Sequence, residues 1–410
     1  MKLHRLAVVA CAVLACVGAW PDADAATREL VVQAGDHDRL HVPLCIDVPD
    51  GTTRAKMLDG AKEVPCQVSE GKLWWVLDAL KAGEAKSYVV DFAAASGADA
   101  DAVKLERPDA TVDITIAGKP FTTYLFAPGK PAGHQLRRPC FFPVFGPDQT
   151  AMTRPFPLTT EIPPEMKNLR KDHPHHTSIW VAHGDVNGVD NWSISGGAGW
   201  QLHRDFQAVA SGAVMGLFRE DLDWTTRDRK PVLAETRTVR VYRLPHTHRM
   251  LDLEIAFHAK YGKVVFGDTK EGGLCATRMR PEFRANNKGR LVNAQGKTAG
   301  DAWGKESEWV DASGTVGEKR YGFAIFDHPR NLRHPTTWHA RTYGLLTANP
   351  FGLSYFTHDR KNKHKGDHTL EEGETLTFRY RIYFHVGDEK QGAVAARYAD
   401  YAQPPTAAWK

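Results

Sequence analysis

The residues best suited to chemistry are concentrated in residues 173–192. This stretch holds four histidines, two aspartates, two asparagines and two tryptophans. Imidazoles and carboxylates transfer protons and bind metal ions near neutral pH, and a tryptophan ring offers a flat apolar face to a sugar. Asp, Asn and Gly also build turns, but turns do not require four histidines. The composition of the stretch therefore predicts a catalytic or binding site.

The order of the histidines in this stretch limits how they could act together. His175 and His176 are adjacent, so in an extended segment they point to opposite faces. Only one of them, for which we choose His176, is then expected to face a common site. The candidate metal ligands are His173, His175, His183 and Asp185, and the ion would be calcium or a transition metal. Asp185 and Asp190 could equally form turns.

A charged segment, residues 267–273, supplies the strongest carboxylate candidate. Glu271 follows Lys270, and a glutamate beside a lysine can donate or accept a proton once it is buried. Arg278 comes shortly after and could bind a substrate oxygen or an oxyanion. The alternative for this string of residues is a charged surface hairpin. Trp303 adds an aromatic ring further along the chain.

A third segment, residues 338–341, places a base beside a fixed cation. His339 and Arg341 are two residues apart, so a strand would carry both on one face. A neutral imidazole beside a guanidinium suits an anionic substrate or a developing oxyanion. The alternative is a His-Pro turn followed by a stacked pair of Trp338 and Arg341.

The elements that must position these residues are mostly strands. Apolar and polar residues alternate over residues 112–116, 251–257 and 376–384, which predicts strands. The alanine-rich residues 393–401 are the best helix candidate, and the 35 glycines and 24 prolines fit many turns. We predict a small N-terminal β domain over residues 27–93, a linker over 94–103, and a large antiparallel β-sandwich over 104–402.

The first 25 residues predict a signal peptide. Two basic residues precede a short apolar run, and small residues around Ala25 suit cleavage there. Lipoprotein anchoring at Cys16 fits less well. The protein is therefore expected in the periplasm or outside the cell. There, Cys45 and Cys66 could form a disulfide, and buried free thiols are the alternative.

Composition excludes several classes of function. The 410 residues carry a formal net charge of +4 without a Lys/Arg-rich block, so nucleic acid is not an expected partner. No later segment is apolar enough to span a membrane. Phosphate-binding loops, dinucleotide-binding glycine motifs, HExxH and GxSxG are missing from the sequence.

Five separated motifs together resemble a bacterial family commonly labelled "methane oxygenase PmoA". They are Arg138–Pro139 with 142–144, residues 173–176 with Trp180 and 183–188, residues 267–272, residues 303–305, and His334–Pro335 with 338–341. The resemblance covers residues 105–400. The label belongs to a membrane subunit built of helices, whereas this chain reads as a secreted β-rich protein, so we do not expect the literal activity. Members tend to occur in polysaccharide-degrading bacteria, which implies carbohydrate chemistry.

The leading hypothesis is a secreted carbohydrate-active enzyme on a sandwich similar to the mutarotase-like supersandwiches. His176 and His339 would be the acid and base, and Glu271 the partner carboxylate. The expected substrate-binding residues are Lys270, Arg278, Arg341, Trp180, Trp192, Trp303 and Trp338. The reaction would be glycosidic cleavage, by hydrolysis or elimination, or epimerisation. The alternatives are a copper oxygenase-like metalloprotein and a non-catalytic glycan-binding protein, and the sequence predicts no oligomeric state.

Overall fold

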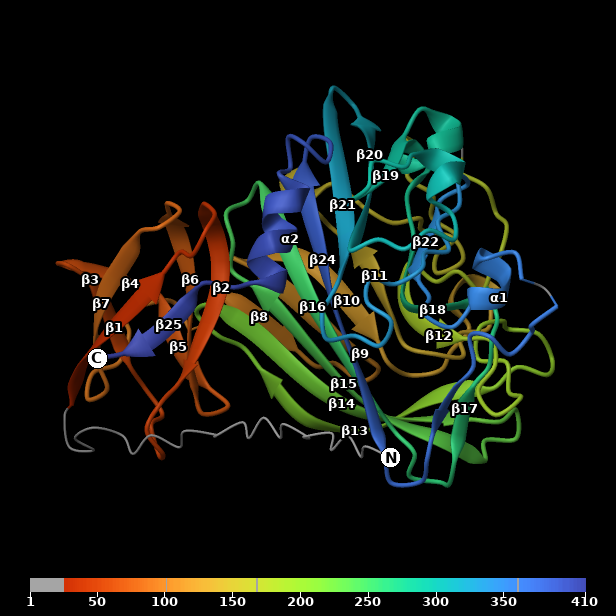
Figure 1. The fold of residues 1–410 in the computed structure, drawn as a ribbon, viewed down its shortest axis with the longest axis horizontal. Coiled ribbons are helices and arrows are strands. Elements are labelled where there is room, and N and C mark those ends of the chain that lie inside the picture. The colour runs from red at the N-terminus through yellow and green to blue at the C-terminus, as the bar shows by residue number, and fades with distance from the viewer. Residues whose placement is uncertain (1–25, 101, 167–168, 360) are drawn as a thin grey trace, which may run out of the picture.

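The computed structural model describes residues 26–100, 102–166, 169–359 and 361–410 (Figure 1). The expected signal peptide and the anchoring alternative at Cys16 lie outside the described residues. The protein is mostly β, with antiparallel sheets packed as a sandwich, so the predicted fold class is confirmed. No helix among the described residues is long and apolar enough to cross a membrane.

Two large antiparallel sheets form the sandwich. The first follows the order β22 (Leu345–Ala348), β18 (Gly272–Arg278), β12 (Ile179–His183), β11 (Cys140–Val144), β10 (Lys119–Leu125), β9 (Thr111–Ile116) and β8 (Val103–Glu106). The second follows the order β13 (Trp200–Ala210), β14 (Met215–Thr225), β15 (Pro231–Tyr242), β16 (His248–His258), β24 (Thr375–Val386), β21 (Lys319–Asp327), β20 (Trp309–Val316) and β19 (Arg290–Asn293). The strands predicted from alternation correspond to β9, β16 and β24.

Strand β16 shows how alternation builds the core between these sheets. Leu251, Leu253 and Ile255 are at most 1% exposed and belong to one hydrophobic cluster that spans both sheets. Burial of each such side chain stabilises the fold by about 1.5–3 kcal/mol. On the opposite face of the strand, Asp252 accepts two hydrogen bonds from Arg381 of β24, at 2.6 and 2.7 Å. The period of two therefore separates an apolar face from a charged one.

The N-terminal unit lies beside the sandwich, at the left of Figure 1. One of its sheets has the order β25 (Thr406–Trp409), β1 (Thr27–Gln33), β7 (Ala85–Asp91), β3 (Lys56–Asp59) and β4 (Lys62–Val64). The other has the order β2 (Arg39–Asp47), β6 (Lys72–Leu80) and β5 (Cys66–Ser69). Because β25 pairs with β1, the C-terminal strand of the chain belongs to this first unit, beyond the boundary expected at 402.

Contacts between the two units come from β5 and from the predicted C-terminal helix, α2 (Val394–Ala402). Gln67 Oε1 accepts hydrogen bonds from the backbone N–H groups of Val214 and Met215, at 2.7 and 2.9 Å. Helix α2 contacts both β2 and β21, and Arg39 donates to Asp400 at 3.3 Å. The units are thus joined by specific polar contacts as well as by the chain.

Three short elements complete the fold near the sandwich's end. These are β17 (Val264–Phe266), which pairs with β23 (His368–Leu370), and helix α1 (Leu353–Phe356). The four described cysteines are free thiols, so the predicted disulfide between Cys45 and Cys66 is wrong. The alternative of buried free thiols holds for Cys66, Cys140 and Cys275, whereas Cys45 is exposed. Cys45 lies opposite Trp74 and Cys66 opposite Trp75, so strand β6 runs between the two cysteines.

Candidate functional site

The three segments singled out in the sequence meet at one cleft of about 760 Å³. Eight of the predicted site residues line it: His173, His175, His176, Trp192, Lys270, Glu271, His339 and Arg341. Its other lining residues include Gly184, Asp190, Ser193, Thr269 and Tyr343. The segments converge because each one adjoins a strand of the same sheet, namely β12, β18 and β22, at the right of Figure 1.

The cleft lies on the face of this sheet that points away from the sandwich core. Along β12, Ile179 and Val181 belong to the core cluster between the sheets, whereas Trp180 and Ala182 belong to a second cluster with Trp192. Successive strand residues face opposite sides, so the second cluster marks the outer face. Loops cover part of this face and leave the cleft between them.

A close approach of backbone joins the first two segments. A Cβ on Gly184 would lie 2.5 Å from the carbonyl oxygen of Glu271. Only glycine therefore allows the turn after β12 to pack against residue 271. His183 strengthens this junction, because its Nε2 donates to the carbonyl of Gly267 at 2.9 Å.

Four aromatic rings form a continuous stack along one wall of the cleft. Tyr343 stacks on His173 at 5.3 Å, His173 on His176 at 4.8 Å, and His176 on Trp180 at 5.4 Å between ring centroids. The three interplanar angles are 8°, 7° and 20°. Trp180 is thus the buried base of the stack. It does not offer a ring surface to a sugar, contrary to the prediction.

His175 and His176 both line the cleft, so the expectation that only one of them faces it is wrong. Their ring centroids are 4.4 Å apart, at 78°. The expectation assumed an extended segment, but residues 173–176 form a turn that the N–H of His176 closes on the carbonyl of His173 at 2.9 Å. His173 adopts a positive φ of 49° within it. In a turn, adjacent side chains do not alternate between faces.

Arg278 fixes the orientation and the tautomer of His176. Its Nη1 donates to Nδ1 of His176 at 3.2 Å, and its Nη2 donates to Asp172 at 2.7 Å. A guanidinium can only donate, so Nδ1 must hold the lone pair and Nε2 the proton of the neutral ring. Burial, then the neighbouring His175 and Arg278, lower the pKa of His176 well below its ordinary value. Burial and then Arg138 lower the pKa of His175 to about 3.

His339 has the opposite tautomer. Its Nδ1 donates to the carbonyl of Lys270 at 2.8 Å, which leaves the lone pair on Nε2. Its backbone N–H donates to Thr347 at 3.0 Å, so the residue is held against β22. Burial lowers the pKa of His339 to about 3 despite the bond to Lys270, and Arg341 adds to the lowering. His339 is therefore a neutral proton acceptor in the cleft.

Glu271 and Lys270 form an ion pair at the rim. The side chain of Glu271 is 43% exposed, so this segment is a charged loop that is partly open to water. The other carboxylate in the lining, Asp190, is already engaged. Its Oδ1 accepts from the backbone N–H groups of Trp192 and Ser193, at 2.8 and 2.9 Å, and its Oδ2 accepts from the Ser193 hydroxyl.

Arg138 braces the loop that carries Trp192. Its guanidinium donates to the carbonyls of His175, Asn191 and Trp192, at 2.7, 3.1 and 2.6 Å. The side chain is buried and spans the cleft wall from one loop to the other. Sequence reasoning did not assign Arg138, Asp172 or Tyr343 to the site. A sequence signal existed only for Arg138, as part of the motif with Pro139.

Six predicted site residues do not line the cleft. Arg278 and Trp180 contact His176 instead, and the other four are Trp338, Trp303, His183 and Asp185. Trp338 is fully buried in the sandwich core and donates from Nε1 to Ser307 at 2.8 Å. Trp303 packs edge-on against His339, 6.3 Å between centroids, and is not among the lining residues of the cleft. His183 holds the loop at Gly267, and Asp185 accepts from the N–H of Gly188 at 2.9 Å, which is the turn alternative. The described residues include no group of three or more His, Cys, Asp or Glu side chains arranged to hold a metal ion, and the metal set of His173, His175, His183 and Asp185 stays a prediction.

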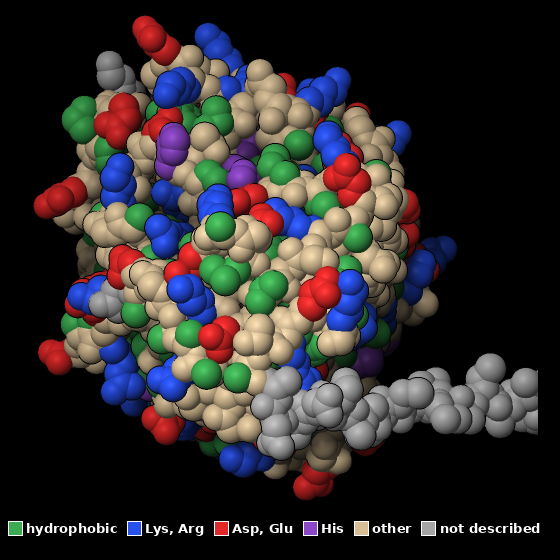
Figure 2. Space-filling model, turned by 90° about the vertical axis from the view of Figure 1, so that its left-hand side faces the viewer, with side chains coloured by type: hydrophobic (Ala, Val, Ile, Leu, Met, Phe, Trp, Pro, Cys, Tyr) green, Lys and Arg blue, Asp and Glu red, His purple; other side chains and the backbone are tan. Residues whose placement is uncertain are grey.

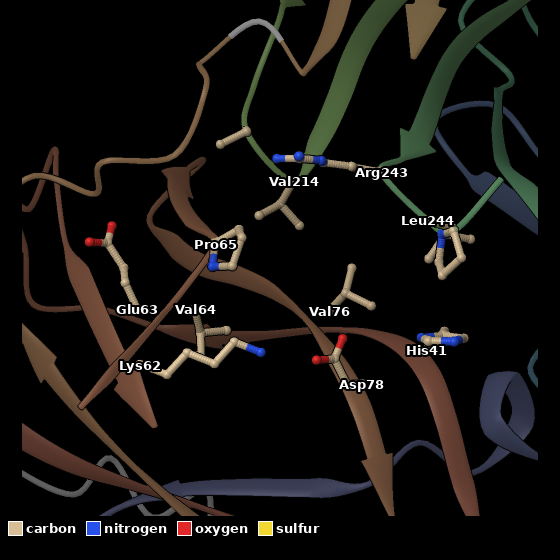
Figure 3. Close-up of a pocket in the computed structure, with 12 residues that line it drawn as sticks. His41, Lys62, Glu63, Val64, Pro65, Val76, Asp78, Val214, Arg243 and Leu244 are labelled. Atoms are coloured by element: carbon tan, nitrogen blue, oxygen red, sulfur yellow. The ribbon is translucent and has the colours of Figure 1, made fainter. Parts of the chain in front are cut away.

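A second cavity, of about 500 Å³, lies between the N-terminal unit and the sandwich (Figure 3). His41, Asp78 and Arg243 point toward it among Val and Pro side chains. None of the three chemistry-bearing segments contributes to its lining. Figure 2 shows the outer face of the N-terminal unit, where cationic and anionic side chains are mixed. We therefore take the cleft at His176 and His339 as the functional site.

The chain belongs to a protein family described as a family of unknown function (DUF6807), whose match covers residues 111–399. The matched region contains every residue of the cleft and excludes all strands of the N-terminal unit. No curated protein matches the chain.

Proposed function

We propose that the protein is an enzyme that performs acid–base chemistry on a sugar within this cleft. One observation carries the proposal: two buried histidines of the cleft are held neutral in opposite tautomers. His339 offers a lone pair at Nε2, and His176 offers a proton at Nε2. One ring can therefore accept a proton while the other donates a hydrogen bond to an oxygen on which negative charge develops.

A sugar fits the shape and chemistry of the walls. The ring of Trp192 and the stack that ends in Tyr343 provide apolar faces, and charged side chains line the same cleft. A cleft of about 760 Å³ lies within the usual range for small-molecule sites, about 300–1,000 Å³. The resemblance to a family found in polysaccharide-degrading bacteria and the expected signal peptide support a role in glycan degradation outside the cytoplasm.

Hydrolysis by a pair of carboxylates has less support. That mechanism needs two free carboxyl groups on either side of the scissile bond. Of the two carboxylates in the lining, Asp190 is engaged by its own loop and Glu271 pairs with Lys270. Elimination and epimerisation instead need a base and a hydrogen-bond donor, which the two histidines provide. Glu271 then acts only through its ion pair with Lys270 at the rim.

Two substitutions test the proposal without removing the hydrogen bonds that position the rings. Asn in place of His339 can still donate to Lys270, and Asn in place of His176 can still accept from Arg278. Each substitution removes only the Nε2 function, so kcat/KM on the sugar substrate should fall by about 10²–10⁴-fold. His364→Asn, an exposed histidine outside the cleft, is the matched control and should keep wild-type activity.

The outcomes separate the hypotheses. Full turnover in both His176→Asn and His339→Asn would refute acid–base catalysis by these rings. Binding of glycans without turnover by the wild-type protein would identify a non-catalytic glycan-binding protein.

A metal-dependent oxygenase, which the PmoA label suggests, is the second candidate. The closeness of the His173, His175 and His176 rings, 4.4 to 5.7 Å between centroids, is the observation that favours it. Against it, Nδ1 of His176 already accepts from Arg278. Elemental analysis of the purified protein decides between the two. A stoichiometric transition metal whose removal abolishes turnover would favour the oxygenase.

A further inference from the structure

The walls of the cleft hold more positive than negative charge. Five cations lie in them or directly behind them: Arg138, Arg154, Lys270, Arg278 and Arg341. Three carboxylates accompany these cations: Asp172, Asp190 and Glu271. The difference of five and three leaves a surplus of two positive charges. Such a surplus in a partly dehydrated cleft attracts anions.

Asp172 illustrates the excess of arginines over carboxylates near the cleft. It accepts from Nη1 of Arg154 and from Nη2 of Arg278, both at 2.7 Å. One carboxylate thus accepts hydrogen bonds from two guanidinium groups, and Nε of Arg170 lies 3.9 Å from it. The polar contacts of Arg138 go to backbone carbonyls, which stabilise a guanidinium without neutralising it.

Arg341 is the cation whose position allows it to bind a substrate in the cleft. It lines the cleft with an exposed side chain, and within the described part of the chain no ion pair between Arg341 and a carboxylate is found. Its guanidinium lies over the ring of Tyr343, 5.5 Å from the centroid, which keeps the group at the cleft. The planar guanidinium can then form two parallel hydrogen bonds to a carboxylate.

We propose that the substrate is an acidic sugar whose carboxylate binds Arg341; this rests on the proposed acid–base function. A carboxylate fits better than a neutral sugar because it offsets the surplus positive charge. The surplus positive charge also affects the basicity of His339. Burial, and after it the cations of Arg341 and Lys270, lower the pKa of His339 to about 3, which makes the ring a weak base before substrate binds. A bound anion beside Arg341 would raise the pKa again and so activate the ring.

A carboxylate also makes the C–H bond of the adjacent carbon more acidic, so a base can remove that proton. Nε2 of His339 takes the proton from the carbon next to the carboxylate, and the C–H electron pair moves onto the carboxylate oxygens, beside Arg341. This pair then forms a carbon–carbon double bond while the bond to the glycosidic oxygen on the next carbon breaks. Nε2–H of His176 polarises that leaving oxygen, which then receives from His339 the proton that His339 took from carbon. The step is a β-elimination, and no oxidant or reductant is needed.

Matched ligands test the role of the carboxylate directly. The probes are oligosaccharides of galacturonate, glucuronate, mannuronate and guluronate, each compared with the same oligosaccharide after chemical reduction of its carboxyl groups. At least one uronate should bind more tightly than its reduced form, by about 10- to 100-fold, as expected for a charge-assisted hydrogen bond. Arg341→Gln should abolish that difference, and Arg330→Gln, an exposed arginine outside the cleft, should preserve it.

Turnover separates this inference from the function on which it rests. Elimination would release an unsaturated uronate, which absorbs in the ultraviolet, and this signal should require His339. Turnover of reduced or neutral sugars that is equal to turnover of uronates would overturn the inference and leave the acid–base proposal intact. Equal binding of every uronate and its reduced form would also overturn it. Failure of every sugar to react would overturn both.

Discussion

Replacing His339 by Asn tests, without any substrate, whether the cleft holds this ring neutral. An unfolded histidine takes up a proton below a pKa of about 6.5. In the folded protein, burial lowers the pKa of His339 to about 3. Between these two values the unfolded state binds one proton more than the folded state. The free energy of unfolding therefore falls as the pH falls below the unfolded value.

The magnitude follows from that one proton. A difference of one bound proton changes stability by about 1.4 kcal/mol per pH unit. Summed from pH 7 to pH 5, His339 should account for a loss of about 2 kcal/mol. Because pH 5 lies well above the folded pKa, the result hardly depends on the folded value. His339→Asn should lose about 2 kcal/mol less than the wild type over this interval.

The assay is urea unfolding at pH 7, 6 and 5, followed by tryptophan fluorescence. The readout is the change of stability with pH, so a general destabilisation by the substitution does not affect it. Thr347→Val is the control, because it removes a neutral hydrogen bond to Gly272, 3.0 Å long, in the same place. It should lower stability by about 1 kcal/mol equally at each pH. Equal acid sensitivity of wild type and His339→Asn would refute a neutral, buried His339.

Two further predictions concern the wall and the pH profile. Arg138→Met removes the donors to the carbonyls of residues 175, 191 and 192 and should destabilise the protein by about 2–4 kcal/mol, with faster proteolysis within residues 184–199. An unchanged unfolding midpoint and cleavage rate would contradict this role. If neutral His339 is the base, kcat/KM should stay level as the pH falls from 7 to about 5, because protonation begins only near its lowered pKa of about 3. A loss of activity centred near pH 6.5 would assign the base to another group.

The sequence was sufficient to predict which side chains share a face where they alternate along strands. The spacing of His339 and Arg341 placed both on one face, and both line the cleft. The same period explains the error at Trp338. If residues 339 and 341 face the cleft, residues 338 and 340 must face the other side, and Trp338 and Ala340 are indeed buried in the core. The alternation therefore contained the information to exclude Trp338 as a sugar-binding ring.

The sequence was insufficient to predict the direction of side chains where tertiary contacts decide the local backbone conformation. The turn at residues 173–176 depends on a positive φ at His173, which non-glycine residues rarely adopt. Arg154 helps to hold this residue by donating to its carbonyl at 3.2 Å. Arg154 lies 19 residues earlier in the chain, and no local pattern connects the two. A strand-based interpretation of His175 and His176 therefore placed only His176 in the cleft, whereas both residues line it.

The geometry and the protonation state of His176 have a single cause. Nδ1 of His176 accepts from Arg278 only while the ring is neutral, because a proton on Nδ1 would set two cations against each other. Asp172 anchors Arg278 from the other side at 2.7 Å, so the guanidinium cannot move away from the ring. Burial alone would raise the pKa of Asp172, but Arg278 and Arg154 lower it, which keeps the anchor charged. The contact with Arg278 that orients the His176 ring is thus also the contact that directs its proton to Nε2.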